Sequence, residues 1–310
     1  MIRRNEQLEW LESFLAVAEH RSFSEASLVL HRSQSRVSAH VAALERTLNA
    51  TLFDRRHRPV QLTDAGDAYL PFARESLKSL DDGAEAVANL AEVIRGVVVV
   101  GCHMSASAGF LVGIIAKLRE THPQVEVQLT EGTTNALTEK LLAGTVNIAI
   151  RNSWPPQPEL ELAHKVLWQE PFVLVLPPGH ALLDAPEPVD PKLLIGHRII
   201  SIGRPGKQIE PEIDRVVNDW GIEADFTLQT EQPQTVVNMV KASLGIGIIN
   251  ALAMEVSDTT GLHARRIGRQ RDGRSVGVWW DPSRYQSAAT RLVLERILDE
   301  PTPRNMLKPN

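Results

Sequence analysis

The chain has 310 residues, 43% of them hydrophobic and 23% charged, and its formal net charge is −5. This composition excludes a disordered chain. The negative net charge argues against a protein that coats nucleic acid by bulk charge, so any such contact needs a local basic patch. The single cysteine, Cys102, excludes an intrachain disulfide. Because no apolar run approaches the roughly 20 residues of a membrane span and no signal peptide is visible, we expect a cytoplasmic protein without membrane contact.

Residues 1–62 predict a module of short helices. Ser22 or Ser24 can cap a short helix in "SFSEASLVL", and Ser33 can cap the helix that follows a tight connection. The apolar stripe of that second helix consists of Val37, Val41, Leu44 and Leu48. The face opposite the stripe consists of Ser35, Ala39, Ala42 and Arg46, with Arg36 and Ser38 flanking it. This face is small, hydroxylic and basic, unlike an ordinary solvated helix face.

A short helix, a tight turn and a helix with a small outer face are typical of a helix-turn-helix. Its second helix must enter a major groove about 12 Å wide, so bulky outward side chains would hold it off. On that helix Gln34 and Ser38 can reach base edges, and Arg36 and Arg46 can reach guanine or phosphate. The alternative is a solvated structural corner, because residues 1–66 hold nine arginines against eight acidic side chains, an excess of only one positive charge.

The stretch "LNATLFDRRHRPVQLT" alternates apolar and polar residues around a proline and predicts a small hairpin. The densest basic cluster of the chain lies at its tip and consists of Arg55, Arg56, His57 and Arg58. These side chains would grip phosphates or enter the minor groove.

Residues 63–95 predict one long helix. Thr63 can cap it, and Asp64 is favourable at the positive end of the helix. Its apolar residues recur at spacings of three and four, at Leu70, Ala73, Leu77, Leu80, Ala84, Val87 and Leu90. Because this spacing is close to a coiled-coil seam, we expect the helix to pack lengthwise against a partner, with Pro71 bending it slightly.

Residues 96–300 predict an α/β region, followed by a tail over 301–310. The β-rich runs are "VVVVGC", "VEVQLTEG", "VNIAIRN", "FVLVLPPG", "RIISIG", "FTLQTE", "IGIIN" and "VGVWWD". Helical patterns stand between many of them, which indicates a largely parallel sheet in one large or two small domains.

Ligands of open α/β sheets bind at the carboxyl ends of strands, against helix amino termini. The residues at those places are Ser105, Ser107, Thr133, Thr134, Asn135, Arg151, Asn152, Ser201, Gly203 and Arg204. Hydroxyls and backbone donors suit a carboxylate or phosphate, and Arg151 strengthens that preference. For any one of these residues, capping a helix is the alternative role. For the group, the pattern favours a cleft for a small, anionic molecule.

The stretch from Phe14 to Gly66 resembles the winged helix-turn-helix of LysR-type transcriptional regulators. The resemblance is carried by Phe23 and Ala26, by "SQSRVS" opening the recognition helix, and by "ALE", "LF" and "LTDAG". It implies base contacts from Gln34, Ser35 and Ser38, a minor-groove position for Arg58 and a phosphate contact from Thr63.

This sequence departs from the family pattern at two positions of the recognition helix. Ser35 stands where family members often have proline, and Ala39 stands where many have arginine. Arg36, one turn earlier, can compensate for the absence of an arginine at Ala39.

The resemblance covers nearly the whole chain and implies an α+β multidomain fold: a winged helix-turn-helix, a long linker helix and a two-lobed α/β effector-binding domain similar to periplasmic binding proteins. For the α/β part it rests on "HPQVEVQLTEGTTNALTEKLLAGTVNIAI", "FVLVLPPGH" and "VKASLGIGI". We expect lobe I at 96–168 plus 265–299 and lobe II at 169–264. In this family the linker helix pairs in a homodimer, so we expect such a dimer here, built further into a tetramer.

The predicted function is a bacterial, ligand-responsive regulator that binds double-stranded DNA and a small-molecule effector, with RNA polymerase as a possible further partner. Asn250 stands where the family commonly has proline, at the edge of the cleft or in its turn. The alternative is a solute-binding receptor for transport, which the α/β module alone would allow.

An enzyme is a further alternative, since Cys102 and His103 are a possible nucleophile and base. Adjacent residues of a strand point to opposite faces, so these two cannot easily pair. The sequence shows no metal-ligand spacing and no phosphate loop, so we expect no catalytic site, cofactor or metal. Cys102 could act as a redox sensor, but a buried small residue at a strand end is the preferred interpretation.

Overall fold

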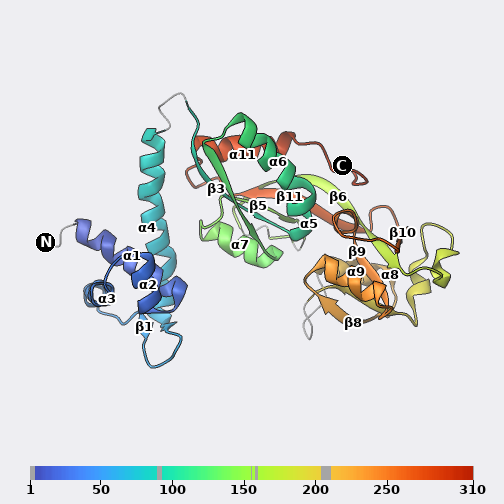
Figure 1. The fold of residues 1–310 in the computed structure, drawn as a ribbon, viewed down its shortest axis with the longest axis horizontal. Coiled ribbons are helices and arrows are strands. Elements are labelled where there is room, and N and C mark those ends of the chain that lie inside the picture. Colours follow the sequence, from blue (N-terminus) through green and yellow to red (C-terminus); the bar gives the residue numbers. More distant parts are fainter. Residues whose placement is uncertain (1–3, 89–92, 155, 158–159, 204–210, 310) are drawn as a thin grey trace. The chain divides into compact units, whose positions relative to one another are not determined.

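The computed structural model describes residues 4–88, 93–154, 156–157, 160–203 and 211–309 (Figure 1). Backbone contacts divide the chain into two units, residues 1–91 and 92–310. The first unit holds the predicted helices and hairpin, and the second holds the α/β region. The division falls close to the predicted change from helical to α/β character.

Three helices build the first unit: α1 (Arg4–His20), α2 (Phe23–Val29) and α3 (Gln34–Leu48). The Ser22 hydroxyl accepts a hydrogen bond from the Glu25 N–H at 3.3 Å, and the Ser33 hydroxyl accepts one from the Arg36 N–H at 3.3 Å. Each hydroxyl satisfies an amide that has no partner inside its helix. The predicted caps are confirmed, with Ser22 and not Ser24 capping α2.

The apolar stripe of α3 fixes this helix against α1. Val37 and Val41 are fully buried in one core with Phe14 of α1. Leu48 is 37% exposed, so the predicted stripe is one residue too long. The reason is that α3 ends at Leu48 and Asn49 turns the chain away with a left-handed backbone. The opposite face of α3 is therefore held toward solvent.

A two-stranded hairpin of β1 (Phe53–Asp54) and β2 (Gln61–Leu62) follows, as predicted. It leads into α4 (Asp64–Ala88), which contains Pro71. The Thr63 hydroxyl accepts a hydrogen bond from the Gly66 N–H at 3.1 Å, which confirms the predicted cap.

The apolar residues of α4 divide into two groups. Leu70, Ala73 and Leu77 pack on the core of the first unit. Farther along the helix, Leu80 and Val87 are 52% and 70% exposed, while the predicted Leu90 lies outside the described residues. The second half of this stripe is therefore uncovered within one copy of the unit.

One mixed sheet runs through the second unit, with its described strands in the order β4-β3-β5-β11-β6-β9-β7-β8 and with β10 paired to β6. The strands are β3 (Gly96–Cys102), β4 (Val125–Glu131), β5 (Ile148–Asn152), β6 (Ala163–Leu176), β7 (Arg198–Ile202), β8 (Asp225–Thr230), β9 (Ile246–Asn250), β10 (His263–Arg266) and β11 (Gly273–Trp280). All eight predicted runs are strands. The expected parallel pairing holds for β3 with β4 and β5 and for β7 with β8 and β9, whereas β6 and β11 are antiparallel to their neighbours.

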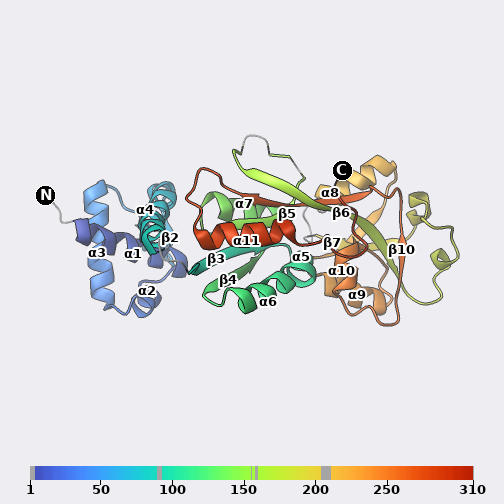
Figure 2. The ribbon, with the colours of Figure 1, turned by 90° about the horizontal axis from the view of Figure 1, so that it is seen from above.

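The first lobe is built on β4, β3, β5 and β11. Its helices α6 (Val112–Thr121) and α11 (Ala288–Asp299) lie on one face of the sheet and α7 (Thr134–Leu142) lies on the other (Figures 1 and 2). The short helix α5 (Met104–Ala106) and a π-helical turn over Ser107–Leu111 lead into α6 directly after β3. This arrangement brings the start of α5 to the carboxyl end of β3.

The second lobe is built on β9, β7 and β8 with the second half of β6. Its helices are α8 (Pro211–Trp220), α9 (Pro233–Lys241) and α10 (Ala251–Glu255), with short 3-10 turns at Ala181–Leu183 and Pro191–Leu194. Alternate residues of β6 face opposite layers: Leu174 packs in the core with α8, and Val173 and Val175 pack in the core with α9.

The two lobes share β6, so the predicted lobe boundaries need correction. The boundary at 169 falls inside β6, which pairs with β11 through its first part and with β9 and β10 through its second part. The boundary at 265 falls inside β10, which pairs with Val173–Leu176 and therefore belongs to the second lobe. The chain returns to the first lobe with β11. None of the helices in the described ranges combines the length and the apolar character needed to cross a membrane.

Candidate functional site

The outer face of α3 carries the predicted recognition residues. Gln34, Ser35 and Arg36 are exposed at its start, Ser38 is half-buried, and Ala39 is exposed. The Ser33 and Ser35 hydroxyls are 3.0 Å apart, which keeps Ser35 close to the cap. Small side chains on an exposed helix face let the helix approach a groove closely.

The two arginines of α3 differ in what they contact. Arg36 Nη2 donates to Glu9 Oε2 of α1 at 3.1 Å. Arg46 is exposed and, within the part of the chain that the structure describes, makes no side-chain hydrogen bond or ion pair. Arg46 therefore presents an unoccupied guanidinium, whereas that of Arg36 is engaged.

The arginines of the hairpin differ in what their side chains contact. Arg56 binds the Asp54 carboxylate at 2.7 and 3.0 Å, and this contact lowers the pKa of Asp54. Arg55 lies over the Phe23 ring at 4.8 Å and donates to Glu45 at 3.3 Å. Arg58 is exposed, with no side-chain partner among the described residues. The Arg58 guanidinium is therefore unoccupied, unlike those of Arg55 and Arg56.

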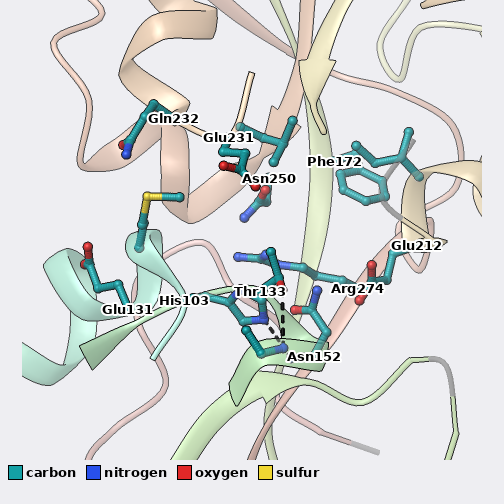
Figure 3. A pocket seen from close by; sticks show the side chains of 15 residues that line it. His103, Glu131, Thr133, Asn152, Phe172, Glu212, Glu231, Gln232, Asn250 and Arg274 are labelled. Atoms are coloured by element: carbon teal, nitrogen blue, oxygen red, sulfur yellow. Dashed lines mark hydrogen bonds between the residues drawn. The ribbon is translucent and has the colours of Figure 1, made fainter. Parts of the chain in front are cut away.

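A cavity of about 400 Å³ lies between the two lobes of the second unit (Figure 3). The first lobe contributes His103, Met104, Glu131, Gly132, Thr133, Ala136 and Asn152. The second lobe and the crossing strands contribute Phe172, Ile202, Glu212, Ile213, Glu231, Gln232, Asn250 and Arg274. This volume suits a small molecule.

Helix amino termini surround the cavity. Thr133 caps α7, its hydroxyl accepting from the Ala136 N–H at 3.4 Å, and Gln232 stands at the cap position of α9. Neither helix has an acidic residue in its first turn, but Glu131 and Glu231 precede the two caps in the sequence and also line the cavity. α8 begins there as well, but it carries Glu212 in its first turn.

His103 forms a neutral part of the wall. Its Nε2 accepts a hydrogen bond from the Asn152 backbone N–H at 3.2 Å, which leaves Nδ1 to carry the proton of the neutral ring. Burial lowers the pKa of His103 to about 3. The side-chain Oδ1 of Asn152 is buried without a hydrogen-bond partner among the described residues. The wall therefore offers an acceptor that a bound molecule can satisfy.

Arg274 and Asn250 connect the cavity to a buried polar cluster where the strands cross. Arg274 Nε donates to Glu170 Oε2 at 2.7 Å, and its Nη2 donates to the Ser105 hydroxyl at 2.8 Å. Asn250 Nδ2 donates to Glu170 Oε1 at 3.1 Å. A change at the cavity wall can thus reach residues from both lobes.

The predicted ligand residues only partly meet at the cavity. Thr133 and Asn152 line it, and Ser105 lies behind Arg274. The predicted residues that do not line it are Ser107, Thr134, Asn135, Arg151, Ser201 and Gly203. Arg204 lies outside the described residues. The predicted ligand residues therefore fall into two groups, those that line the cavity and those that do not.

Arg151 was the predicted anion contact, yet it is fully buried and stacks on the Trp279 ring at 3.8 Å. Its Nη1 donates to the Asn152 carbonyl at 3.0 Å, and burial lowers its pKa to about 10. Thr134 is also buried, with its hydroxyl 3.3 Å from His103 Nε2. Both residues support the wall from behind.

Several residues that line the cavity were not predicted from the sequence to do so, among them His103, Phe172 and Arg274. His103 directly follows β3. The rule that ligands bind at the carboxyl ends of strands led to Ser105 and could have led to His103 as well. Arg274 lies at the start of β11, where that rule does not apply.

Cys102 is fully buried, and burial raises its pKa to about 12, which removes it as an exposed nucleophile. Within the described ranges, no group of His, Cys, Asp and Glu side chains is arranged to hold a metal ion.

Two family models match the chain. The model described as "Bacterial regulatory helix-turn-helix protein, lysR family" matches residues 8–67, and the "LysR substrate binding domain" matches residues 91–302. The first match lies in the first unit and ends within the first turn of α4, and the second covers most of the second unit.

Curated relatives match over most of their length. A probable RuBisCO transcriptional regulator of Guillardia theta is 28% identical over 300 residues, covering 94% of this chain and 95% of that protein. The HTH-type transcriptional regulator AlsR of Bacillus subtilis is 28% identical over 251 residues, covering 81% of this chain and 82% of that protein.

Solved structures share the fold. A full-length OxyR variant from Pseudomonas aeruginosa superposes with a TM-score of 0.74 at 21% identity, covering 98% of each chain. Full-length CbnR complexed with its target DNA has a TM-score of 0.68 at 22% identity, covering 94% of this chain and 98% of that chain.

Proposed function

This chain belongs to the LysR family of transcriptional regulators, and from that premise we propose that it reads DNA with α3 and the hairpin and responds to a small molecule in the cleft between its lobes. The observation that carries DNA reading is the exposed, small outer face of α3. Arg46 and Arg58 add guanidiniums without partners among the described residues. Gln34, Ser35 and Ser38 would contact bases, and these arginines would contact phosphates. The phosphate contact expected from Thr63 is not part of this proposal, because its hydroxyl already donates to the Thr51 carbonyl at 2.7 Å.

DNA footprinting on the region upstream of the chain's own gene tests this reading, with and without a cell metabolite extract. We expect a protected site whose extent changes with the extract. Arg58→Ala should weaken binding on every duplex and lower the salt slope by about one. Absence of protection at low salt would contradict DNA reading, and a footprint that no extract alters would contradict the response.

For the effector we propose a small molecule with one anionic group. The positive ends of α7 and α9 and the guanidinium of Arg274 support an anion at this wall. Glu131 also lines the cavity and would repel a second negative charge. The effector would place its anionic group near Thr133, and Asn152 Oδ1 would accept a hydrogen bond from a separate donor group of the effector.

Thermal shift with matched pairs of small carboxylates and their amides tests the charge. We expect at least one carboxylate to raise the melting temperature more than its amide does, and Thr133→Val to reduce that rise. Thr145→Val is the matched control, since the Thr145 hydroxyl bonds the Lys140 carbonyl away from the cavity. If amides stabilise the protein as much as the carboxylates, or if no carboxylate does, the anionic proposal is wrong.

We also propose that two copies pair through α4. The support is the exposed second half of its apolar stripe, with Leu80 and Val87. Burial of such a stripe against a second helix removes apolar surface from water. Assembly into a tetramer and a contact with RNA polymerase are further parts of this proposal.

A further inference from the structure

Arg36 lies about one turn before Ala39 on the exposed side of α3, but its guanidinium is already engaged. Arg36 Nη2 lies 3.1 Å from Glu9 Oε2 and 3.4 Å from Glu9 Oε1. The pair joins α3 to α1, and the Arg36 side chain remains 57% exposed. A cation that is exposed and yet bound by a carboxylate is restrained without being buried.

The surroundings of Glu9 make Arg36 its main donor. The Ser13 hydroxyl donates to the Glu9 carbonyl at 2.8 Å and lies 2.9 Å from His40 Nδ1. His40 Nε2 lies 3.4 Å from Glu9 Oε2. Burial lowers the pKa of His40, and the nearby Glu9 carboxylate opposes this shift. The hydrogen bond from Arg36 is the largest cause of the lowered pKa of Glu9, so Arg36 is the main partner of this carboxylate.

A neighbouring ion pair joins α1 to the turn that precedes α3, and its arginine is less exposed. Arg32 Nη2 binds Glu12 Oε2 at 2.7 Å, and its side chain is only 18% exposed. Arg32 is thus held inside the structure, whereas Arg36 lies at the edge of the face proposed to approach DNA. Exposed ion pairs contribute little to stability, so a phosphate can compete with Glu9 for Arg36.

We propose that Glu9 restrains Arg36, so that Arg36 binds a DNA phosphate only after this pair breaks, and that Glu9 thereby sets the DNA affinity of the module. This inference rests on the proposed DNA reading by α3. A released Arg36 would add a phosphate contact with its counterion release. A phosphate contact carries no sequence information, so the restraint acts equally on specific and non-specific DNA.

A double-mutant cycle in the full chain tests the restraint. The proteins are the wild type, Glu9→Gln, Arg36→Ala and the double variant. Glu19→Gln is the matched control, since Glu19 is an exposed carboxylate on the same helix with no side-chain contact among the described residues. Fluorescence anisotropy measures the dissociation constant for a duplex from the chain's own upstream region and for a scrambled duplex, at several salt concentrations. Circular dichroism checks that each variant is folded.

We expect Glu9→Gln to tighten binding to both duplexes about two- to fivefold, with a steeper salt dependence, and Glu19→Gln to change it less. In the Arg36→Ala background, the Glu9→Gln effect should shrink to that of Glu19→Gln. If Glu9→Gln raises the DNA affinity by the same factor in the wild type and in the Arg36→Ala background, Glu9 simply repels DNA and the proposed restraint is wrong. The proposed restraint is also wrong if Glu9→Gln binds DNA no more tightly than Glu19→Gln does. If the wild type binds neither duplex at low salt, the failure is that of the proposed DNA reading itself.

Discussion

Glu170 and Arg274 form a buried ion pair on the two strands that cross between the lobes, with Arg274 Nε donating to Glu170 Oε2 at 2.7 Å. The Glu170 side chain is fully buried and that of Arg274 is 9% exposed. The second carboxylate oxygen of Glu170 accepts from Asn250 Nδ2 and from the Leu252 N–H at 2.9 Å. One carboxylate thus joins β6, β11 and the start of α10 beneath the cavity.

Removal of one partner of this pair should destabilise the second unit strongly. Glu170→Ala leaves a guanidinium buried without its counter-charge, so we expect a decrease of about 3–5 kcal/mol in the free energy of unfolding. Urea denaturation of the full chain measures it. Glu120→Ala, at an exposed carboxylate on α6, is the control and should stay within about 0.5 kcal/mol of the wild type. A decrease for Glu170→Ala no larger than that of the control would show that the pair does not hold the lobes.

Protonation of His103 should contribute to the pH dependence of the free energy of unfolding. Burial lowers its pKa from 6.5 to about 3. Between these two values the unfolded chain binds more protons than the folded chain at this residue. The contribution of His103 is therefore complete above about pH 6.5 and is lost as the pH falls through that window.

His103→Gln keeps an acceptor for the Asn152 N–H and should flatten the decline of unfolding free energy below neutral pH. Urea denaturation at several pH values from 4 to 7 compares it with His263→Gln, a change at an exposed histidine of β10. Identical pH slopes for the two variants would mean that His103 is protonated at its ordinary pKa in the folded protein.

Local patterns in the sequence predicted the first unit well. The caps at Ser22 and Ser33, the stripe of Val37 and Val41 and the hairpin all depend on residues a few positions apart. The prediction that Leu48 belongs to the buried stripe was wrong. Asn49 ends the helix directly after Leu48, so this last turn is not covered by the core.

The cleft was only partly predictable because it depends on strand register. Arg151 and Asn152 are neighbours at the end of β5, so their side chains point to opposite faces. Asn152 lines the cavity and Arg151 stacks on Trp279 behind it. The strand-end signal selects both residues alike and cannot say which faces the ligand. Glu170 and Arg274 meet only through the pairing of two strands distant in sequence.

Cys102 should be inert in the folded protein. It is fully buried at the end of β3, and burial raises its pKa to about 12, so the reactive thiolate is scarcely formed at neutral pH. We expect no reaction with Ellman's reagent at pH 8 in native buffer and one thiol per chain in denaturant. Rapid labelling of the native protein would reopen the redox-sensor interpretation.

The oligomeric state should depend on the exposed stripe of α4. Leu80→Asp with Val87→Asp places two charges on a surface that we propose to be buried in the dimer, and an unpaired buried charge is costly. We expect a shift from dimer to monomer in sedimentation velocity at micromolar concentration. Ser79→Asp is the control, since Ser79 is an exposed neighbour off the stripe, and it should sediment as the wild type does. If the double variant keeps the mass of the wild type, copies of the chain pair through another surface.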